Sequence, residues 1–247
     1  ARAGADKLAA ALGQQVVVEN RAAGGNGTVA TRAIAKAPAD GYTLLLGYTS
    51  TLATSPHMLS VGYDPVRDFA PITMLATLPN MLIVHPSLNV ASVRELVALL
   101  KANPNKYSFG SAGNGTSQHI SGELFKIMTG TQMQHIPYKG SGPMIPDLLA
   151  GTIQLSFENI TTAYPQVKGG KLKALAVTSS KRSFVAPEVP TMSEAGLAGY
   201  DISSWQAMYA PAATPREIVA RLHAETVKTL RSPENQKKLS EIGRAHV

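Results

Sequence analysis

The chain has 247 residues, of which 44% are hydrophobic, enough to form a large core in one or two domains. Its longest apolar runs fall far short of the roughly 20 residues that cross a bilayer, so we expect no membrane insertion. The formal net charge is +7, but the lysines and arginines are scattered, which argues against a nucleic-acid partner and is compatible with small anions. There is no cysteine, so a disulfide framework and a thiolate metal site are both excluded.

Both ends of the sequence look interrupted. The first residues, "ARAGADKLAAALG", already show helical spacing, with no initiator Met and no signal peptide before them. At the other end, "EIGRAHV" has neither a capping residue nor a polar tail, and we interpret residues 241–247 as a non-native tail. We therefore expect the natural protein to differ from this chain at both ends.

Apolar runs of strand length alternate with segments of helical period along the chain. Strands are predicted over residues 15–20, 42–47, 81–85, 107–111, 133–138, 153–158 and 172–179. Helices are predicted over the first residues and over 28–37, 92–102, 116–128, 144–152 and 216–230. This alternation predicts an α/β protein whose parallel sheets are covered on both faces. Two such series, one before about residue 80 and one after about residue 105, indicate two lobes.

A glycine-rich loop, "SAGNGT", lies between the strand over 107–111 and the helix over 116–128. Glycine permits a positive φ and close approach to a ligand, and the free N–H groups of a first helical turn attract an anion. The glycine spacing fits neither a phosphate-binding P-loop nor a dinucleotide fingerprint. A carboxylate needs only a few N–H donors and a hydroxyl, which Ser111, Thr116 and the amides of 112–116 can supply. A purely structural tight turn is the alternative.

Motifs for catalysis are lacking. The sequence contains no G-x-S-x-G elbow, no H-E-x-x-H pair and no cysteine nucleophile. His119 and Glu123 lie four residues apart on a helix, a spacing that metal sites use, but with no third ligand nearby a structural hydrogen bond is favoured. His57, His85 and His135 are isolated in the sequence. We expect no enzymatic activity, no metal and no cofactor.

Six segments in consistent order carry a resemblance to a known family. From about Ala1 to Arg231 the chain resembles the substrate-binding subunit of the tripartite tricarboxylate transporters, also called the Bug family. The segments are "QQVVVENRAAGGNGTVATRAIAKAPADGYTLLLG", "YDPVRDFAPIT", "YSFGSAGNGTSQHISGELF", "IPYKGSGPMIPDLLAGTIQLSFEN", "GGKLKALAVTSSKRS" and "PEVPTMSEAGLAGYD".

The resemblance implies a periplasmic receptor that is not an enzyme. It implies a two-lobed, type II periplasmic-binding-protein fold, each lobe a mainly parallel sheet flanked by helices. A hinge would close the lobes on a small organic acid, which the receptor, expected to be a monomer, delivers to a membrane permease. Lobe 1 would comprise residues 1–82 and 205–240, and lobe 2 residues 83–204. The first strand of lobe 1, with its ligand loop, would precede Ala1.

The resemblance also assigns ligand-binding residues. The second-lobe loop of the family corresponds to Ser111, Ala112, Gly113, Asn114, Gly115 and Thr116. We expect further walls of the site at Tyr48, Thr49, Ser50 and Thr51, at Tyr138, Lys139 and Gly140, and at Asn159, each at the end of a predicted strand. A helix cap is the alternative for 48–51 and a solvated surface the alternative for Lys139. Trp205 and Gln206 would lie at a hinge or cleft wall, or Trp205 in the core.

Three other readings of the same sequence stay open. A ligand-sensing domain of a transcription regulator, and an extracytoplasmic sensor that binds a membrane kinase, share this fold. A hydrolase would require turnover of a bound ester. An upstream helix-turn-helix, a signal peptide beside multi-span membrane proteins, or measured ester turnover would distinguish them.

Overall fold

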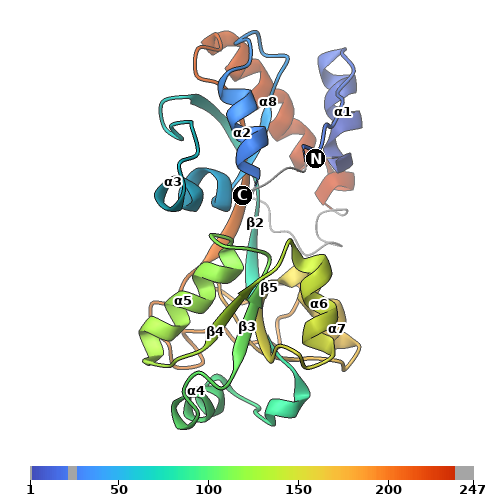
Figure 1. Cartoon of the computed structure of the whole chain (residues 1–247). Helices are drawn as coiled ribbons and strands as arrows, with labels where there is room; N and C mark the ends of the chain where they lie inside the picture. Colours follow the sequence, from blue (N-terminus) through green and yellow to red (C-terminus); the bar gives the residue numbers. More distant parts are fainter. Residues whose placement is uncertain (1, 22–26, 237–247) are drawn as a thin grey trace. The chain divides into compact units, whose positions relative to one another are not determined.

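The computed structural model describes residues 2–21 and 27–236, and these form two compact units (Figure 1). Unit 1 comprises Ala1–Thr77 and Trp205–Val247, and unit 2 comprises Leu78–Ser204. The chain thus passes between units after residue 77 and after residue 204, where we had expected passages after 82 and 204. The expected tail, 241–247, lies outside the described residues. None of the helices in the described ranges has the length and hydropathy of a membrane span.

Unit 1 combines a small sheet with helices from both ends of the sequence. Its helices are α1 (Arg2–Leu12), α2 (Thr28–Ala35), a π-helical turn (Ser50–Thr54), α3 (Ser55–Met58) and α8 (Arg216–Arg231). Its strands are β1 (Leu45–Tyr48), the first part of β2 (Phe69–Val84) and most of β7 (Ser203–Pro211). Strand β7 lies between β1 and β2, and it is antiparallel to β1. The rings of Tyr63 and Phe69 meet edge to face in the core, with centroids 5.9 Å apart.

An apolar cavity of about 510 Å³ lies inside unit 1. Aliphatic side chains line most of it, among them Leu8, Leu12, Leu44, Met208 and Leu222. Val16, Val17 and Val18 also line it, within the segment 15–20 that we predicted to be a strand. That prediction is wrong: the segment forms no strand, and Val17 is 76% exposed. A strand forms only where a neighbouring backbone pairs with it, and valine content alone does not supply that neighbour.

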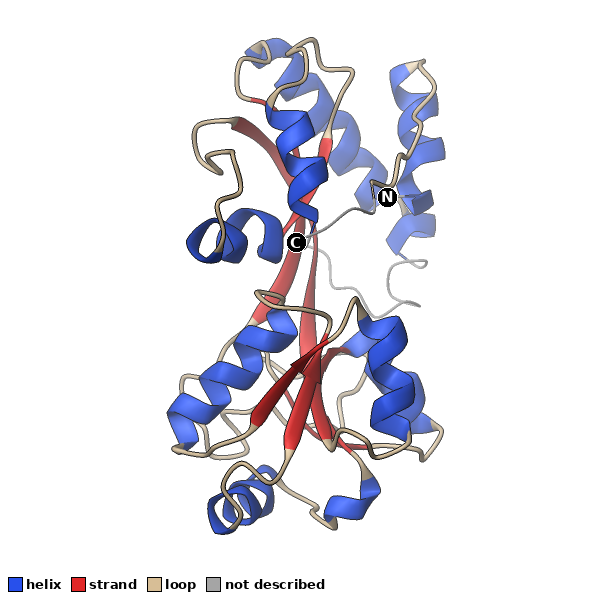
Figure 2. Cartoon of the chain, viewed as in Figure 1, coloured by secondary structure: helices blue, strands red, loops and turns tan. Residues whose placement is uncertain are grey.

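Unit 2 is a five-stranded sheet between two layers of helices (Figure 2). Besides the second part of β2, its strands are β3 (Ser108–Ser111), β4 (Gln134–Pro137), β5 (Leu155–Asn159) and β6 (Lys173–Val177). Its helices are a 3-10 turn (Pro86–Leu88), α4 (Val93–Ala102), α5 (Ser117–Thr129), α6 (Ser141–Leu149) and α7 (Ile160–Lys168).

The alternation of side chains along β2 divides the core of unit 2 in two. Leu82 and Val84 pack with residues of α4 and α5, whereas Met81 and Ile83 pack with residues of α6 and α7. All four β2 side chains are fully buried. A strand buried on both faces reads as a continuous apolar run, which is why "MLIV" predicted the strand correctly.

Strand direction differs in part from the mainly parallel sheets that we expected. In unit 2, β3 is parallel to β4 and to β5, but β2 is antiparallel to β5 and to β6. In unit 1 the described pair β1 and β7 is antiparallel. Strands β2 and β7 carry the chain between units, so their direction is not set by a βαβ crossover. In unit 2, β3, β4, β5 and β6 therefore run in one direction and β2 runs against them, so the sheet of unit 2 is mainly parallel as predicted, whereas the described pair of unit 1 is not.

Candidate functional site

Three loops predicted to bind the ligand lie at one edge of the unit 2 sheet. Because β3, β4 and β5 are parallel, their carboxyl ends meet at the same edge, where open α/β sheets bind ligands. The loop 111–116 follows β3, Tyr138 to Gly140 follow β4, and Asn159 ends β5. Two hydrogen bonds tie the first two loops together, from Tyr138 N to Ser111 O at 3.0 Å and from Gly140 N to Ala112 O at 3.1 Å.

Each of these loops leads directly into a helix. Thr116 caps α5, Gly140 precedes α6 and Asn159 precedes α7. The three helices have 13, 9 and 9 residues, so each presents a full first turn and a partial positive charge at its N-terminus. The edge is therefore electrostatically suited to an anion.

The loop 111–116 is held in shape by its own polar groups. Gly113 and Gly115 have φ values of 135° and 77°, a region that other residues adopt only under strain. Ser111 is fully buried, and its Oγ accepts a hydrogen bond from Gly113 N at 3.1 Å. Thr116 Oγ1 donates to Gly113 O at 2.7 Å and accepts from His119 N at 3.4 Å, the N-cap bond of α5.

Several loop amides that we expected to face the ligand are bonded within unit 2. Gly113 N donates to Ser111 Oγ, Gly115 N donates to His119 Nδ1 at 3.1 Å, and Thr116 N donates to Gly113 O at 3.3 Å. In this conformation these three amides hold the loop. Asn114 is exposed at the tip of the loop, and Ala112 is partly exposed.

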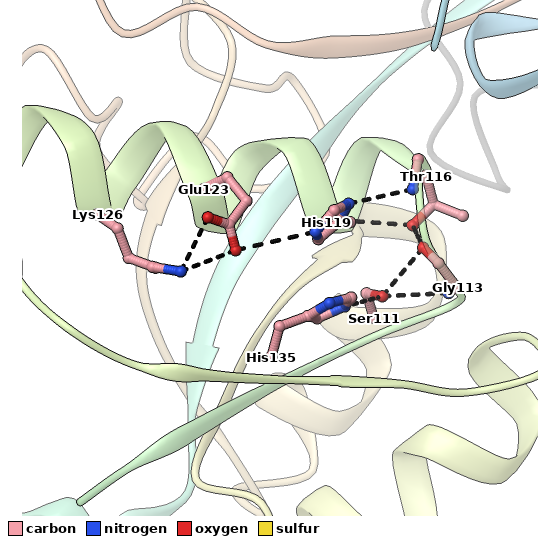
Figure 3. A network of polar contacts seen from close by, with 8 residues as sticks. Ser111, Gly113, Thr116, His119, Glu123, Lys126 and His135 are labelled. Carbon is pink, nitrogen blue, oxygen red and sulfur yellow. Dashed lines mark hydrogen bonds and ion pairs between the residues drawn. The ribbon is translucent and has the colours of Figure 1, made fainter. Parts of the chain in front are cut away.

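Two histidines that hydrogen-bond to this loop are stacked on each other (Figure 3). The rings of His119 and His135 have centroids 4.1 Å apart and planes inclined by 22°, and His135 also stacks on Phe109 at 4.9 Å. Burial lowers the pKa of His119; burial and the neighbouring His119 lower the pKa of His135 to about 4. Both imidazoles are therefore neutral near pH 7.

His119 and Glu123 lie on one face of α5, as their spacing predicts. His119 Nε2 faces Glu123 Oε1 at 3.8 Å, and Glu123 pairs with Lys126 at 2.8 Å. No group of three metal-ligating side chains occurs within residues 2–21 and 27–236.

The other predicted site residues of unit 2 differ in what their side chains do. Tyr138 Oη donates to Asp147 Oδ2 at 2.7 Å, which fixes the ring against α6. Lys139 is exposed, as a solvated lysine would be, and it directly precedes Gly140, the N-cap residue of α6. Asn159 is partly exposed, and its backbone N donates to Glu158 Oε1 at 2.9 Å.

The predicted residues of unit 1 form a compact turn after β1. Thr51 Oγ1 donates to Tyr48 O at 2.9 Å, and Thr49 Oγ1 accepts from Trp205 N at 2.9 Å. Ser50 and Thr51 are buried. The side chain of Thr49, the N-cap residue of the π-helical turn, makes no cap hydrogen bond, so these bonds are not those of the helix cap that the sequence left open as the alternative. Trp205 packs against the core of unit 1.

The comparisons with known proteins settle the family. A family model described as "Tripartite tricarboxylate transporter family receptor" matches residues 1–246. The chain belongs to this family. Protein BugT of Bordetella pertussis is 40% identical over 234 residues, covering 94% of this chain and 72% of BugT. A protein encoded between tcbD and tcbE in Pseudomonas sp. strain P51 is 37% identical over 238 residues, covering 96% of this chain and 70% of the relative.

Solved structures of this receptor family match the whole chain. R. palustris Rpa4515 with adipate is 39% identical, with a TM-score of 0.91, covering 99% of this chain and 82% of that one. MatC from Rhodopseudomonas palustris with bound malate is 29% identical, with a TM-score of 0.89, covering 99% of this chain and 83% of that one. The periplasmic binding protein BugD is 34% identical with a TM-score of 0.88, covering all of this chain and 82% of that one. Membership places the chain among binding proteins and not among enzymes.

The sequence did not single out two buried residues that this receptor places at the same sheet edge. Glu158 is fully buried; its Oε1 accepts hydrogen bonds from Ser141 Oγ and Asn159 N, both at 2.9 Å, and its Oε2 has no partner among the described residues. Asn80, paired with Asn159 across β2 and β5, is also fully buried and donates from Nδ2 to Ser121 Oγ at 3.1 Å. An acidic residue inside the apolar run "IQLSFE" was the available signal for Glu158.

Proposed function

We propose that this receptor captures a small organic acid in the periplasm and delivers it to the membrane permease of a tripartite tricarboxylate-type transporter. The family model over residues 1–246 carries the proposal, because it describes a transporter receptor. Two similar proteins were solved with dicarboxylates, adipate in one and malate in the other. A ligand with two carboxylates is therefore the first class to test.

We assign one carboxylate to the edge of unit 2 where three helices begin. The loop 111–116, Gly140 and Asn159 stand at the N-termini of α5, α6 and α7. Helix N-termini stabilise a negative charge without a lysine or arginine in contact. Backbone recognition of this kind reads the carboxylate and leaves the rest of the ligand to other residues of the pocket.

We infer that Tyr48 to Thr51 and Lys139 complete the pocket, and that the two units close around the acid. The chain passes between units only at residues 77–78 and 204–205, so β2 and β7 would serve as the hinge. Closure would be driven by the higher affinity of the closed state for the ligand.

The test is a thermal-shift and calorimetric screen of the purified protein with adipate, malate, other organic acids and, as controls, nucleotides. A ligand at one hundred times its dissociation constant stabilises the folded state by about 2.7 kcal/mol, a readily measured shift. Stabilisation by a nucleotide and by none of the acids would contradict the proposal.

Two further measurements test the site and the partner. Asn159→Ala is expected to weaken acid binding about tenfold or more, whereas Lys171→Gln, at an exposed lysine beyond α7, is expected to leave it unchanged. Addition of the receptor to vesicles that contain the permease should stimulate uptake of the bound acid. Binding without uptake would instead favour a sensor role.

A further inference from the structure

The hydrogen bond between Gly115 N and His119 Nδ1 links the predicted ligand loop to the helix that follows it. Gly115 is buried, and a buried backbone N–H is destabilising when it loses its hydrogen-bond acceptor. The imidazole of His119 therefore helps to fix the backbone between Gly113 and Thr116.

This bond requires one protonation state of His119. Nδ1 accepts from Gly115 N only if it carries no proton, so the imidazole is neutral with its proton on Nε2. Nε2 faces Glu123 Oε1 at 3.8 Å, and Glu123 is held by Lys126. The side chain of His119 is 15% exposed, so protonation would place a positive charge in a largely buried position.

The stacked His135 reinforces the neutral state. Its ring lies between His119 and Phe109, and its Nε2 is 2.7 Å from Ser111 Oγ. Ser111 Oγ also has Gly113 O within 3.1 Å, so the hydroxyl has an acceptor whether His135 accepts from it or donates to it. His135 thus tolerates either hydrogen-bond direction, whereas His119 does not.

Burial and the charged side chains around His119 and His135 determine how strongly the neutral imidazoles are favoured. Burial and the charge of Lys126 lower the pKa of His119, and Glu123 opposes them. Burial, His119 and Lys126 lower the pKa of His135, and Glu123 again opposes them. Two positive imidazoles at a ring distance of 4.1 Å would repel each other.

We propose that His119 is a positioning residue of the receptor: its neutral Nδ1 fixes the 113–116 backbone in the shape that receives the organic acid, with His135 stacked behind it. The inference rests on the proposed function, since it takes loop 111–116 as a ligand contact. It predicts that ligand affinity falls, and does not rise, when His119 gains a positive charge. Protonation of His119 brings a positive charge closer to an anionic ligand, yet it removes the acceptor of Gly115 N and so weakens binding.

The experiment compares His119→Asn with His119→Leu. Asparagine places Oδ1 near the position of Nδ1 and does not titrate, whereas leucine fills similar space without an acceptor. At pH 7.5 the dissociation constant for adipate or malate, whichever binds the parent, should change less than threefold in H119N and rise about tenfold or more in H119L. Parent-like binding by H119L would overturn the inference.

The pH arm uses H119N as the reference, because ligand protonation affects parent and variant equally. The pH is lowered until NMR of the His119 ring shows that it takes up a proton, and over that range the ratio of the parent's dissociation constant to that of H119N should rise. A ratio that stays flat while His119 becomes protonated, or that falls because the added charge attracts the acid, would contradict a positioning role. This arm remains decisive if H119L does not fold.

Amide hydrogen exchange without ligand separates the inference from the proposed function. The Gly115 amide should be protected in the parent and in H119N and should exchange faster in H119L, while amides of α4 exchange alike in all three. If the parent binds no organic acid, the proposed function fails. Equal exchange of the Gly115 amide in parent and H119L would then also overturn the positioning role, and faster exchange in H119L would support it.

Discussion

The backbone of Gly122, in α5, lies against the ring of Phe109, in β3, with no room for a methyl group between them. A Cβ at residue 122 would come within 2.5 Å of Phe109 Cζ and even closer to Cε2. Phe109 is fully buried, packs on Phe157 and stacks on His135. Helix α5, which begins at the ligand loop, is thus seated on the sheet through this glycine.

Gly122→Ala is therefore expected to destabilise the protein, although alanine favours a helix over glycine by about 1 kcal/mol. Overpacking should cost more than that gain and leave a net loss of about 1–2 kcal/mol in the free energy of unfolding. Urea denaturation at pH 7.5 measures it. The matched control is Gly142→Ala, near the start of α6, where a Cβ meets nothing within 4 Å and stability should be unchanged or slightly higher. Equal effects at the two glycines would show that Phe109 can move aside.

Tyr200→Phe tests the contact that joins the segment before β7 to α5. Tyr200 is fully buried, and its Oη donates to Ser121 O at 2.7 Å. Loss of the hydroxyl leaves a buried carbonyl with one partner fewer, and we expect a loss of about 1–2 kcal/mol in urea denaturation. Tyr164→Phe is the control, because its hydrogen bond to Glu188 is exposed and should contribute less than about 0.5 kcal/mol. A Y200F protein as stable as Y164F would contradict the prediction.

Local signals predicted much of unit 2 correctly. Thr116 caps α5 and Gly130 ends it at a φ of 62°, as N-cap and C-cap preferences predict. The short strands β3 and β4 lie within the predicted segments 107–111 and 133–138. Each of these elements carries its boundary residues in its own sequence.

Elements that depend on distant partners were missed. The first part of β2, over 69–80, contains two prolines, and β7 has only weak alternation, so neither pattern predicted a strand. Both are strands because they pair with each other and with remote neighbours. Segment 15–20 shows the converse, an apolar run without a pairing partner.

The candidate site shows the same division. Composition predicted that "SAGNGT" forms a glycine-rich turn before a helix. Composition could not predict that amides of this loop bond to Ser111 and His119, because these bonds depend on side-chain directions within the folded loop. The stacking of His119 on His135 follows from β3 pairing with β4, which sets Phe109 beside His135. No spacing of single histidines indicates it.

Glu158→Gln is expected to change the pH dependence of stability. Burial raises the pKa of Glu158, while hydrogen bonds from Ser141 and from the backbone of Asn159 oppose the shift. A raised pKa in the folded state means that the stability from Glu158 is present below its unfolded pKa of about 4.5 and is lost as pH rises through the folded value. The free energy of unfolding of the parent, relative to that of E158Q, should therefore fall as the pH rises from 4 toward 8. A constant difference would show that Oε2 is solvated.

His135→Phe is expected to flatten the response of stability to mild acid. Burial, with the neighbouring His119, lowers the pKa of His135 to about 4, so the folded state binds a proton less readily than the unfolded chain, in which histidine titrates near 6.5. The stability from the neutral ring is complete above pH 6.5 and is lost as the pH falls toward 4. After a discount for the exposed part of the ring, the loss is on the order of 2 kcal/mol.

Phenylalanine keeps the stack on Phe109 and His119 but cannot take up a proton. Loss of the contact between His135 and Ser111 shifts the whole curve of H135F by a similar amount at each pH, and His57, His85 and His223 are common to both proteins. Urea denaturation at pH 7.5, 6.5, 5.5 and 4.5 should therefore show the parent losing stability relative to H135F across that range. Parallel curves would mean that His135 stays accessible to protons in the folded state, and that the stacked pair does not hold the loop's histidines neutral.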